Sequence, residues 1–375
     1  MIIKLGEEIE EYTLRNKKDE DILVYSVTND KGFCTGYFSK DVSSKDQSTY
    51  KIVPYGCFAY NPSRINVGSV DWQHCEDKVI VSPLYVVFKV SNKINPQYLY
   101  YYLKSDIART YIKATAAGSV RDNLKFSMLK KFPFNLRTLE EQSKIVKVLE
   151  RVENNIELYK KRAEYLDTLV KSRFIEMFGH QSHNEKKFPY MTISDVAEIH
   201  LGITHTPTYV NSGIMFISAK NTSRDYLDLS GVKYISREEF EEAPQGAKPQ
   251  VNDVLFSRVG SNLGHPVILN EKLEVCTFVS LGFLRTKGNV TSNYLKHWMR
   301  DDFFARQVAE HVKGGGQPNL NTGWLKKFKI IVPDIKLQKE FDIFSAQTDK
   351  SKLAVQKSLE ELETLKKSLM QEYFG

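Results

Sequence analysis

Residues 138–179 read TLEEQSKIVKVLERVENNIELYKKRAEYLDTLVKSRFIEMFG, and residues 334–375 repeat their pattern 196 positions later. Apolar or small side chains alternate four and three residues apart through the first copy, at Ile145, Leu149, Val152, Ile156, Tyr159, Ala163, Leu166 and Val170. This spacing is typical of a coiled-coil seam. Thr138 followed by Glu141 fits a capping box, and Gly179 fits a left-handed helix end. The stretch therefore predicts one long α-helix.

The second copy keeps the same frame with a poorer seam. Its apolar positions are Phe341, Val355, Leu359, Leu362, Leu369 and Tyr373, while Ser345, Thr348 and Lys352 also fall on the seam. A helix of this size would be about 60 Å long at 1.5 Å per residue. Because a seam of that length needs a partner, we expect the two copies to pack against one another as an antiparallel coiled coil.

The repeat extends upstream of both helices at the same offset of 196 residues. The matched positions are Tyr98-Leu99 with Tyr294-Leu295, Asp106 with Asp302, Gly118 with Gly314, Asn123-Leu124 with Asn319-Leu320, residues 129–132 (LKKF) with 325–328 (LKKF), and Gln142 with Gln338. Before Tyr98 the halves share little beyond Val81-Ser82 with Val279-Ser280. A shared framework with dissimilar remainders indicates duplicated domains with two different specificities.

We therefore expect an α+β protein with two pseudo-symmetric mixed α/β domains separated by the helices. The boundaries are 1–137, 138–179, 180–333 and 334–375. In the first domain, residues 21–27, 52–60 and 79–90 are rich in strand-forming side chains, and 96–116 predicts a helix opening at Pro96. In the second, the expected strands are 214–218, 254–256, 267–269 and 281–285, and the matching helix is 292–312. Residues 181–187 are the expected link into the second domain.

Composition and charge narrow the class of protein. No run of 18 apolar residues is present, the acidic start resembles no signal peptide, and the four cysteines form no CxxC pair, so we expect a cytoplasmic protein. The two helical repeats hold 15 basic and 16 acidic residues, which leaves 38 basic and 30 acidic residues elsewhere. The positive excess of the globular parts favours a polyanionic partner over a merely basic soluble protein.

The motifs of common enzymes are missing or incomplete. There is no Walker A sequence, and Pro333-Asp334 lacks the partners of a nuclease site and lies at a helix start. Residues 61–64 (NPSR) copy half of an adenine-methyltransferase motif, but Arg64 replaces the aromatic that would stack on a flipped base. His180 and His183 lack a third metal ligand nearby. We expect no catalytic residue and no metal site in this chain.

Several loops combine basic residues with Ser, Asn or Gln, the side chains that reach phosphates and base edges. The candidate DNA-binding residues are Lys45, Ser63, Arg64, Arg121, Asn123, Lys220, Asn221, Arg224, Arg258, Ser261, Asn262, Lys313, Gln317 and Asn319. For each of them the alternative is a solvated loop side chain. Asn123 and Asn319 have a stronger alternative, because their equivalent positions suggest a scaffold role such as helix capping. Specificity should lie where the halves differ.

The layout resembles the specificity subunit of type I restriction–modification systems over essentially the whole chain. The motif that carries the resemblance is a Gly/polar loop with Asn-Leu (118–124), then LKKF (129–132), then LEEQSKI (139–145) at the helix start. The second copy keeps 314–320 and 325–328 but departs at 337–341 (LQKEF), where the acidic pair before Gln338 is absent.

The resemblance implies a non-catalytic DNA-binding subunit. Each variable domain would be a target-recognition domain for one half of an asymmetric, bipartite double-stranded DNA site. The helices would dock two methyltransferase subunits, and motor-endonuclease subunits would complete the complex. S-adenosylmethionine, ATP and Mg²⁺ would then be held by those partners and not by this chain. The alternative is a coiled-coil scaffold protein with two protein-binding domains, whose positive charge is incidental.

Overall fold

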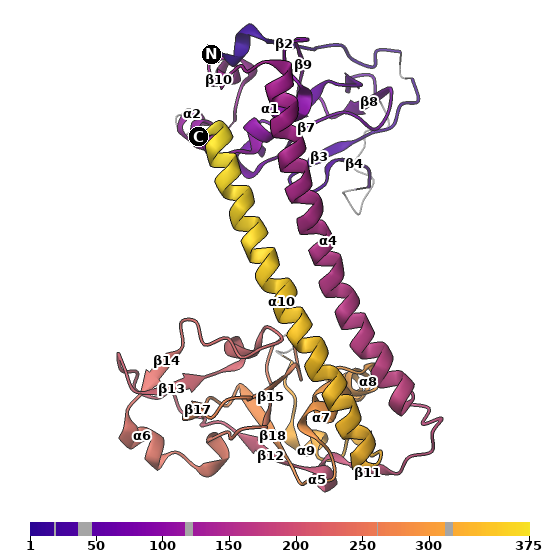
Figure 1. Cartoon of the computed structure of the whole chain (residues 1–375), viewed down its shortest axis with the longest axis vertical. Helices are drawn as coiled ribbons and strands as arrows, with labels where there is room; N and C mark the ends of the chain where they lie inside the picture. Colours follow the sequence, from indigo (N-terminus) through magenta and orange to yellow (C-terminus); the bar gives the residue numbers. More distant parts are fainter. Residues whose placement is uncertain (19, 37–46, 117–122, 261, 312–317) are drawn as a thin grey trace. The chain divides into compact units, whose positions relative to one another are not determined.

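The computed structural model describes residues 1–18, 20–36, 47–116, 123–260, 262–311 and 318–375. The chain forms two compact units: unit 1 is Met1–Lys161 with Gln356–Gly375, and unit 2 is Arg162–Val355. The two expected long helices are confirmed as α4 (Leu139–Phe178) and α10 (Ile335–Phe374), each of 40 residues. Each helix contributes one of its ends to each unit (Figure 1).

The ends of these helices have the expected local chemistry. Glu141 accepts from the Thr138 backbone N–H at 2.9 Å, and the Thr138 hydroxyl accepts from the Glu141 N–H at 3.3 Å, which completes the capping box. Gly179 has a φ of 74°, a left-handed conformation that glycine adopts without strain. At the start of α10, Asp334 accepts from the Lys336 N–H at 2.7 Å.

Within each unit the helices pack side by side and antiparallel. In unit 1, Glu153 pairs with Lys366 at 2.7 Å, and the later Lys160 pairs with the earlier Glu363 at 3.7 Å. In unit 2, Lys352 pairs with Asp167. The predicted seam is confirmed, because its residues in α4 and those in α10, Ser345 and Thr348 included, are buried or half-buried. Mixed surface charge and a buried apolar seam thus produce the helix pair.

Both units contain the same four-stranded antiparallel sheet. In unit 1 the order is β2 (Ile9–Glu11), β9 (Val86–Val90), β6 (Phe58–Tyr60), β7 (Val70–Trp72); in unit 2 it is β12 (Ala197–Leu201), β18 (Leu281–Thr286), β15 (Val254–Ser257), β16 (Pro266–Ile268). A two-stranded pair accompanies each sheet: β1 (Ile2–Lys4) with β10 (Pro133–Asn135), and β11 (Tyr190–Thr192) with β19 (Lys329–Ile331). The structural repeat therefore reaches back before Tyr98, where the sequences share little.

The remaining strands differ between the units. Unit 1 has two further antiparallel pairs, β3 (Ser26–Thr28) with β4 (Gly32–Cys34) and β5 (Lys51–Pro54) with β8 (Lys78–Val81). Unit 2 has a three-stranded sheet, β14 (Lys233–Ile235), β13 (Ile214–Ile217), β17 (Val275–Thr277), with one parallel pair. The short helices are η1 (Leu5–Glu7), η2 (Ile65–Val67), α3 (Phe126–Leu129), α5 (Ile193–Val196), η3 (Ala219–Thr222), α6 (Arg237–Glu242), η4 (Gln245–Ala247) and α9 (Thr322–Leu325).

The predicted strands of the first domain were too long. Residues 52–60 divide into β5 and β6, because Gly56 turns the chain with a φ of 79°. Residues 79–90 divide into β8 and β9 at a turn in which the Tyr85 N–H donates to the Ser82 carbonyl at 3.0 Å. Residues 21–27 form a regular strand only from Ser26, apart from an isolated bridge at Val24. The four strands predicted in the second domain are confirmed to within one residue.

Each predicted single helix before a long helix is in fact two. Residues 96–116 form α1 (Pro96–Lys104) and α2 (Asp106–Ala116), because Ser105 is extended and its hydroxyl accepts from the Ala108 N–H at 3.3 Å. Residues 292–311 form α7 (Ser292–Met299) and α8 (Asp302–His311), with Asp301 accepting from the Phe303 N–H at 2.8 Å. Polar side chains that cap the following turn interrupt both helices.

Repeated buried residues make the same contacts in both units. The hydroxyl of Tyr98 donates to the Asn135 carbonyl at 3.1 Å, and that of Tyr294 donates to the Ile331 carbonyl at 2.7 Å. The last aromatic of a long helix packs on each tyrosine ring: Phe374 lies 5.1 Å from Tyr98, and Phe178 lies 4.9 Å from Tyr294. The duplication read from the sequence therefore holds at the level of single contacts. No helix among the described residues is long and apolar enough to span a membrane.

Candidate nucleic-acid interface

In unit 1 the candidate residues Ser63 and Arg64 lie in the loop that follows β6, which we call loop 61–68. The Asn61 carboxamide oxygen accepts from the Ser63 N–H at 3.1 Å and its hydroxyl at 2.9 Å, forming an Asx turn. Arg64 is exposed and precedes η2, and Gly68 closes the loop with a φ of 97°. A small rigid turn thus presents an exposed guanidinium.

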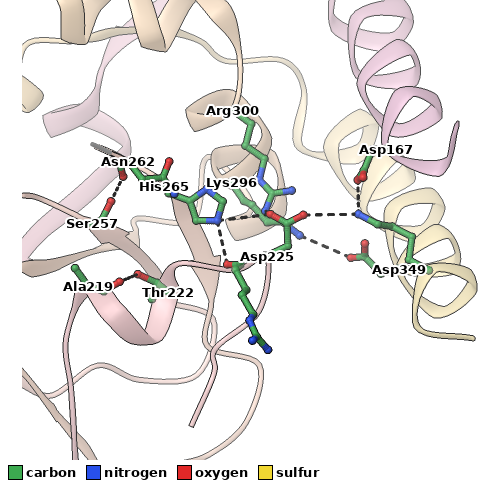
Figure 2. A network of polar contacts seen from close by, with 12 residues as sticks. Asp167, Ala219, Thr222, Asp225, Ser257, Asn262, His265, Lys296, Arg300 and Asp349 are labelled. Atoms are coloured by element: carbon green, nitrogen blue, oxygen red, sulfur yellow. Dashed lines mark hydrogen bonds and ion pairs between the residues drawn. The ribbon is translucent and has the colours of Figure 1, made fainter. Parts of the chain in front are cut away.

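In unit 2 the equivalent loop 257–264 follows β15 and contains Arg258 and Asn262. Arg258 is half-buried, and its Nη1 donates to the Val279 carbonyl at 2.9 Å while its Nε donates to the Leu320 carbonyl at 3.3 Å. Burial lowers the pKa of this guanidinium. Asn262 is exposed and accepts from the Ser257 hydroxyl through its backbone carbonyl (Figure 2). Arg258 therefore anchors the loop, and its contact with DNA stays a prediction.

The two loops share one backbone hydrogen bond, made to the segment that precedes α3 or α9. The Leu124 N–H donates to the Pro62 carbonyl at 3.1 Å, and 196 residues later the Leu320 N–H donates to the Arg258 carbonyl at 2.8 Å. Asn123 and Asn319 consequently lie beside the two loops. Neither caps a helix, since α3 and α9 have Lys125 and Asn321 at their N-caps, so any scaffold role takes another form.

A third segment, residues 219–228, carries Lys220, Asn221 and Arg224 beside loop 257–264. Lys220 and Arg224 are exposed, and Arg224 Nη1 lies 2.5 Å from the Tyr226 hydroxyl and 3.5 Å from Asp228. Asn221 is used internally, because its amide oxygen accepts from the Ser218 N–H and its amide nitrogen donates to the Asp228 carbonyl, both at 2.9 Å. Exposed cations and a structural asparagine thus share this segment.

Five candidate residues lie outside the described part of the chain: Lys45, Arg121, Ser261, Lys313 and Gln317. Of the others, the structure brings Ser63, Arg64 and Asn123 together in unit 1, and Lys220, Asn221, Arg224, Arg258, Asn262 and Asn319 together in unit 2. Each of these residues remains a predicted DNA contact.

Two basic residues that the sequence analysis missed lie where α1 meets α2 and α7 meets α8, and we call them corner cations. Lys104 Nζ donates to the carbonyls of Gly68 at 2.5 Å and Asn29 at 3.1 Å. Arg300 Nη2 donates to Asp225 Oδ1 at 2.8 Å (Figure 2). Lys104 and Arg300 are related by the offset of 196, as are Asn29 and Asp225, so aligning the repeat position by position would have found them.

The corner cations also line two corresponding cavities against the long helices. Lys104 shares a cavity of about 450 Å³ with Glu153 and Lys366. Arg300 shares one of about 170 Å³ with Asp349 and Lys352. Burial lowers the pKa of Lys104 to about 8. Opposite charges in both cavities balance one another, so neither is a clear anion or cation site.

The described residues contain no group of three His, Cys, Asp or Glu side chains arranged to hold a metal ion. His180 instead pairs with Glu185, with 3.0 Å between Nδ1 and Oε1. The four cysteines are free thiols.

The sequence matches the family model "Type I restriction modification DNA specificity domain" over residues 15–167 and again over 185–364. The chain belongs to this family. The two matches to the DNA specificity domain contain loop 61–68 with Lys104 and loop 257–264 with Arg300, respectively. The resemblance predicted from the repeated motifs is confirmed.

Similar proteins agree with the family and the fold. The chain is 22% identical to the MjaIX type I restriction enzyme specificity subunit of Methanocaldococcus jannaschii over 271 residues, which are 65% of this chain and 60% of that relative. A solved chain from work on complex assembly and conformational transition of the type I R-M system has a TM-score of 0.64 at 19% identity, covering 100% of this chain and 97% of its own. The S subunit from M. genitalium has a TM-score of 0.56 at 14% identity, with 100% and 96% covered. These two structures show that the specificity-subunit fold extends over the whole chain.

Proposed function

We propose that this chain is the non-catalytic specificity subunit of a type I restriction–modification complex, which reads an asymmetric bipartite DNA site with one unit for each half. The observation that carries the proposal is the duplicated loop. The same sheet, a loop at the same place after β6 or β15 and the same Leu124 or Leu320 hydrogen bond present different residues in the two units. One scaffold with two faces suits two different half-sites.

The exposed cations supply the chemistry for DNA. Arg64 in unit 1 and Lys220 and Arg224 in unit 2 are exposed on loops, where they can pair with phosphates or donate to guanine. The positive excess lies in the globular parts of the chain and not in the helical repeats. A DNA-reading role explains that distribution, whereas a protein-binding scaffold does not require it.

The long helices offer apolar surface for the proposed methyltransferase subunits. Leu158, Tyr165 and Leu169 are exposed on α4, and Ile343, Leu353 and Leu365 are exposed on α10. Tyr165 is 71% exposed and Leu353 is 72% exposed, and a docked methyltransferase would cover such side chains. Two helical repeats would accommodate two methyltransferases, which would hold S-adenosylmethionine, while ATP and Mg²⁺ would belong to motor-endonuclease subunits.

The test is a map of N6-methyladenine in cells that express this chain with its methyltransferase partner. We expect an asymmetric split motif. Arg64→Ala should relax or abolish the base preference of one half, and Arg224→Ala that of the other. A motif-independent methylation pattern with a folded, active partner would refute the proposal and leave the coiled-coil scaffold.

Arg258 and Lys220 should respond differently to salt. Affinity falls as salt rises, and removing one phosphate-binding cation makes the slope of log affinity against log salt less steep by about 1. We expect Lys220→Ala to lower the slope, because that ammonium is exposed. Arg258→Ala should weaken binding with an unchanged slope, since its guanidinium is bound to two backbone carbonyls. Equal slopes for both variants would contradict this assignment.

A further inference from the structure

We propose that the corner cations Lys104 and Arg300 are positioning residues, each of which fixes the DNA-reading loops of its own unit and so sets discrimination at its own half-site. This inference rests on the proposed function. Neither residue is offered as a DNA contact. Both lie behind the loops, where they bond to groups of the protein itself.

In unit 2 the corner cation Arg300 acts through Asp225, which lies within segment 219–228. Its carboxylate lies 2.8 Å from Arg300 Nη2, 3.6 Å from His265 Nε2 and 3.9 Å from Lys352 Nζ (Figure 2). The Arg300 side chain is 25% exposed and that of Asp225 is 52% exposed, so the guanidinium is partly shielded from water while the carboxylate is open to it. Asp225 directly follows Arg224, so the pair holds the backbone that carries a candidate DNA contact.

The same network reaches loop 257–264. His265 directly follows Gly264, and its Nε2 lies 3.0 Å from the Arg224 carbonyl as well as close to Asp225 (Figure 2). Fixing Asp225 therefore fixes the position of segment 219–228 against loop 257–264. Lys352 of α10 also pairs with Asp167 of α4, which extends the network from the loops to the helix pair.

In unit 1 the equivalent corner uses backbone carbonyls. Lys104 Nζ spans Asn29 and Gly68, which correspond to Asp225 and Gly264 in unit 2. The fit is close, because a Cβ added at Gly68 would lie 2.2 Å from the Asn29 side-chain oxygen. In unit 1 the corner cation joins the two segments directly, whereas in unit 2 Arg300 holds segment 219–228 and His265 joins that segment to loop 257–264.

Position decides discrimination because base readout depends on hydrogen-bond geometry. A bidentate contact to a base edge distinguishes bases only when donor and acceptor meet at hydrogen-bonding distance. Surface loops have few internal contacts and open easily on their own. A charge-assisted bond at the base of two such loops removes that freedom. Removing the corner cation should therefore reduce discrimination more than overall phosphate attraction.

The experiment measures binding of the full chain, with its methyltransferase partner, to its mapped site and to sites changed at one base in either half. We compare Arg300→Met, Arg300→Lys and Asp225→Asn with the corresponding Lys104→Met and Lys104→Arg. Arg306→Met is the matched control, since Arg306 is exposed on α8 and its Nε bonds only to the Asp302 carbonyl of its own helix. Thermal unfolding of each variant is recorded in parallel.

We expect Arg300→Met and Asp225→Asn to reduce discrimination at one half-site by about tenfold or more, equivalent to about 1.4 kcal/mol, and to leave the other half-site unchanged. Lys104→Met should do the reverse. Arg300→Lys and Lys104→Arg should keep most of the discrimination, and the salt slope should stay constant. The double variant Arg300→Met with Asp225→Asn should lose less discrimination than the sum of the two single variants, because both substitutions remove the same ion pair.

Three results would overturn the inference. The first is that every corner-cation variant discriminates between sites as well as Arg306→Met does. The second is that a corner-cation variant loses discrimination equally at both half-sites. The third is a salt slope lower by about 1, which would make the cation a phosphate contact. If the unaltered complex shows no bipartite site, the proposed function itself fails, so the two failures are distinguishable.

Discussion

His297 is a half-buried ionisable residue whose effect on stability can be predicted from its surroundings. Its ring lies against Phe174 and Phe341, with centroids 6.0 and 5.1 Å away. Burial lowers the pKa of His297 well below its usual range, and the nearby charges of Lys296, Arg300 and Lys352 lower it further. As the pH falls below about 6.5, His297 therefore binds a proton in the unfolded chain but not in the folded chain.

Acid should consequently destabilise the protein through His297. Stability from neutral His297 is fully present above pH 6.5 and is lost as the pH falls below that value, by up to about 1.4 kcal/mol per pH unit. His297→Phe should remove this slope, although it also removes a partner of Ser345 that lies 3.4 Å away. Urea unfolding of both proteins between pH 7.5 and 5 would measure it. Parallel pH profiles would show that His297 does not carry the acid sensitivity.

Individual polar residues mark a limit of what the sequence predicts. Arg64 and Arg258 read alike as loop arginines, yet Arg64 is exposed whereas Arg258 bonds to Val279 and Leu320 from distant segments. Asn221 likewise uses its amide inside its own segment. Local sequence gives a side chain its chemistry, and only the fold decides which neighbours use it.

At the scale of elements, a buried glutamine holds the start of each long helix. Gln142 accepts from the Asn95 N–H at 2.7 Å and donates to the carbonyls of Lys93 and Arg137 at 2.9 and 2.8 Å. Gln338 repeats this arrangement with Thr291, Asn289 and Pro333. Both side chains are fully buried, so the backbone groups that bond to them could not bond to water instead.

Gln142→Met keeps the size of the side chain but leaves three backbone groups without their partner. We expect unit 1 to lose at least about 2 kcal/mol, since each buried unpaired group costs about 1–3 kcal/mol. The control is Gln356→Met, which changes an exposed position of α10 and should be near neutral. Chemical denaturation followed by circular dichroism would compare them. A Gln142→Met protein as stable as the control would contradict the role given to the glutamine.

The elements also show which patterns the sequence reveals. The long helices and the short strands of the second domain follow from periodicity and capping signals, which are local. The breaks at Ser105 and Asp301 were missed because the apolar helical pattern continues through them. The duplicated sheet was not predicted, because the equivalent strands β6 and β15 have different residues at their buried positions. Strand pairing is long-range, so unlike sequences can build one topology.

At the scale of the whole molecule, the chain completes its first unit with its last residues. Phe374 is 7% exposed and packs on Tyr98 and Tyr102, with centroids 5.1 and 6.3 Å away. Phe178 is fully buried in unit 2, against Tyr294 and Phe341 at 4.9 and 5.5 Å. The two phenylalanines are 196 residues apart and thus form a matched pair for testing the units separately.

Phe374→Ala should destabilise unit 1 and Phe178→Ala unit 2, each by about 3–5 kcal/mol, the usual cost of emptying a buried aromatic site. Amide hydrogen exchange, resolved along the chain, distinguishes the units. We expect Phe374→Ala to speed exchange in α1 and α2, far away in sequence, more than in α7 and α8. Phe178→Ala should give the opposite exchange pattern. In binding experiments it should reduce discrimination at the half-site assigned to unit 2 before discrimination at the other half-site. Faster exchange in both units with either substitution would show that they do not open independently, and the assignment of one unit to each half-site would lose its structural basis.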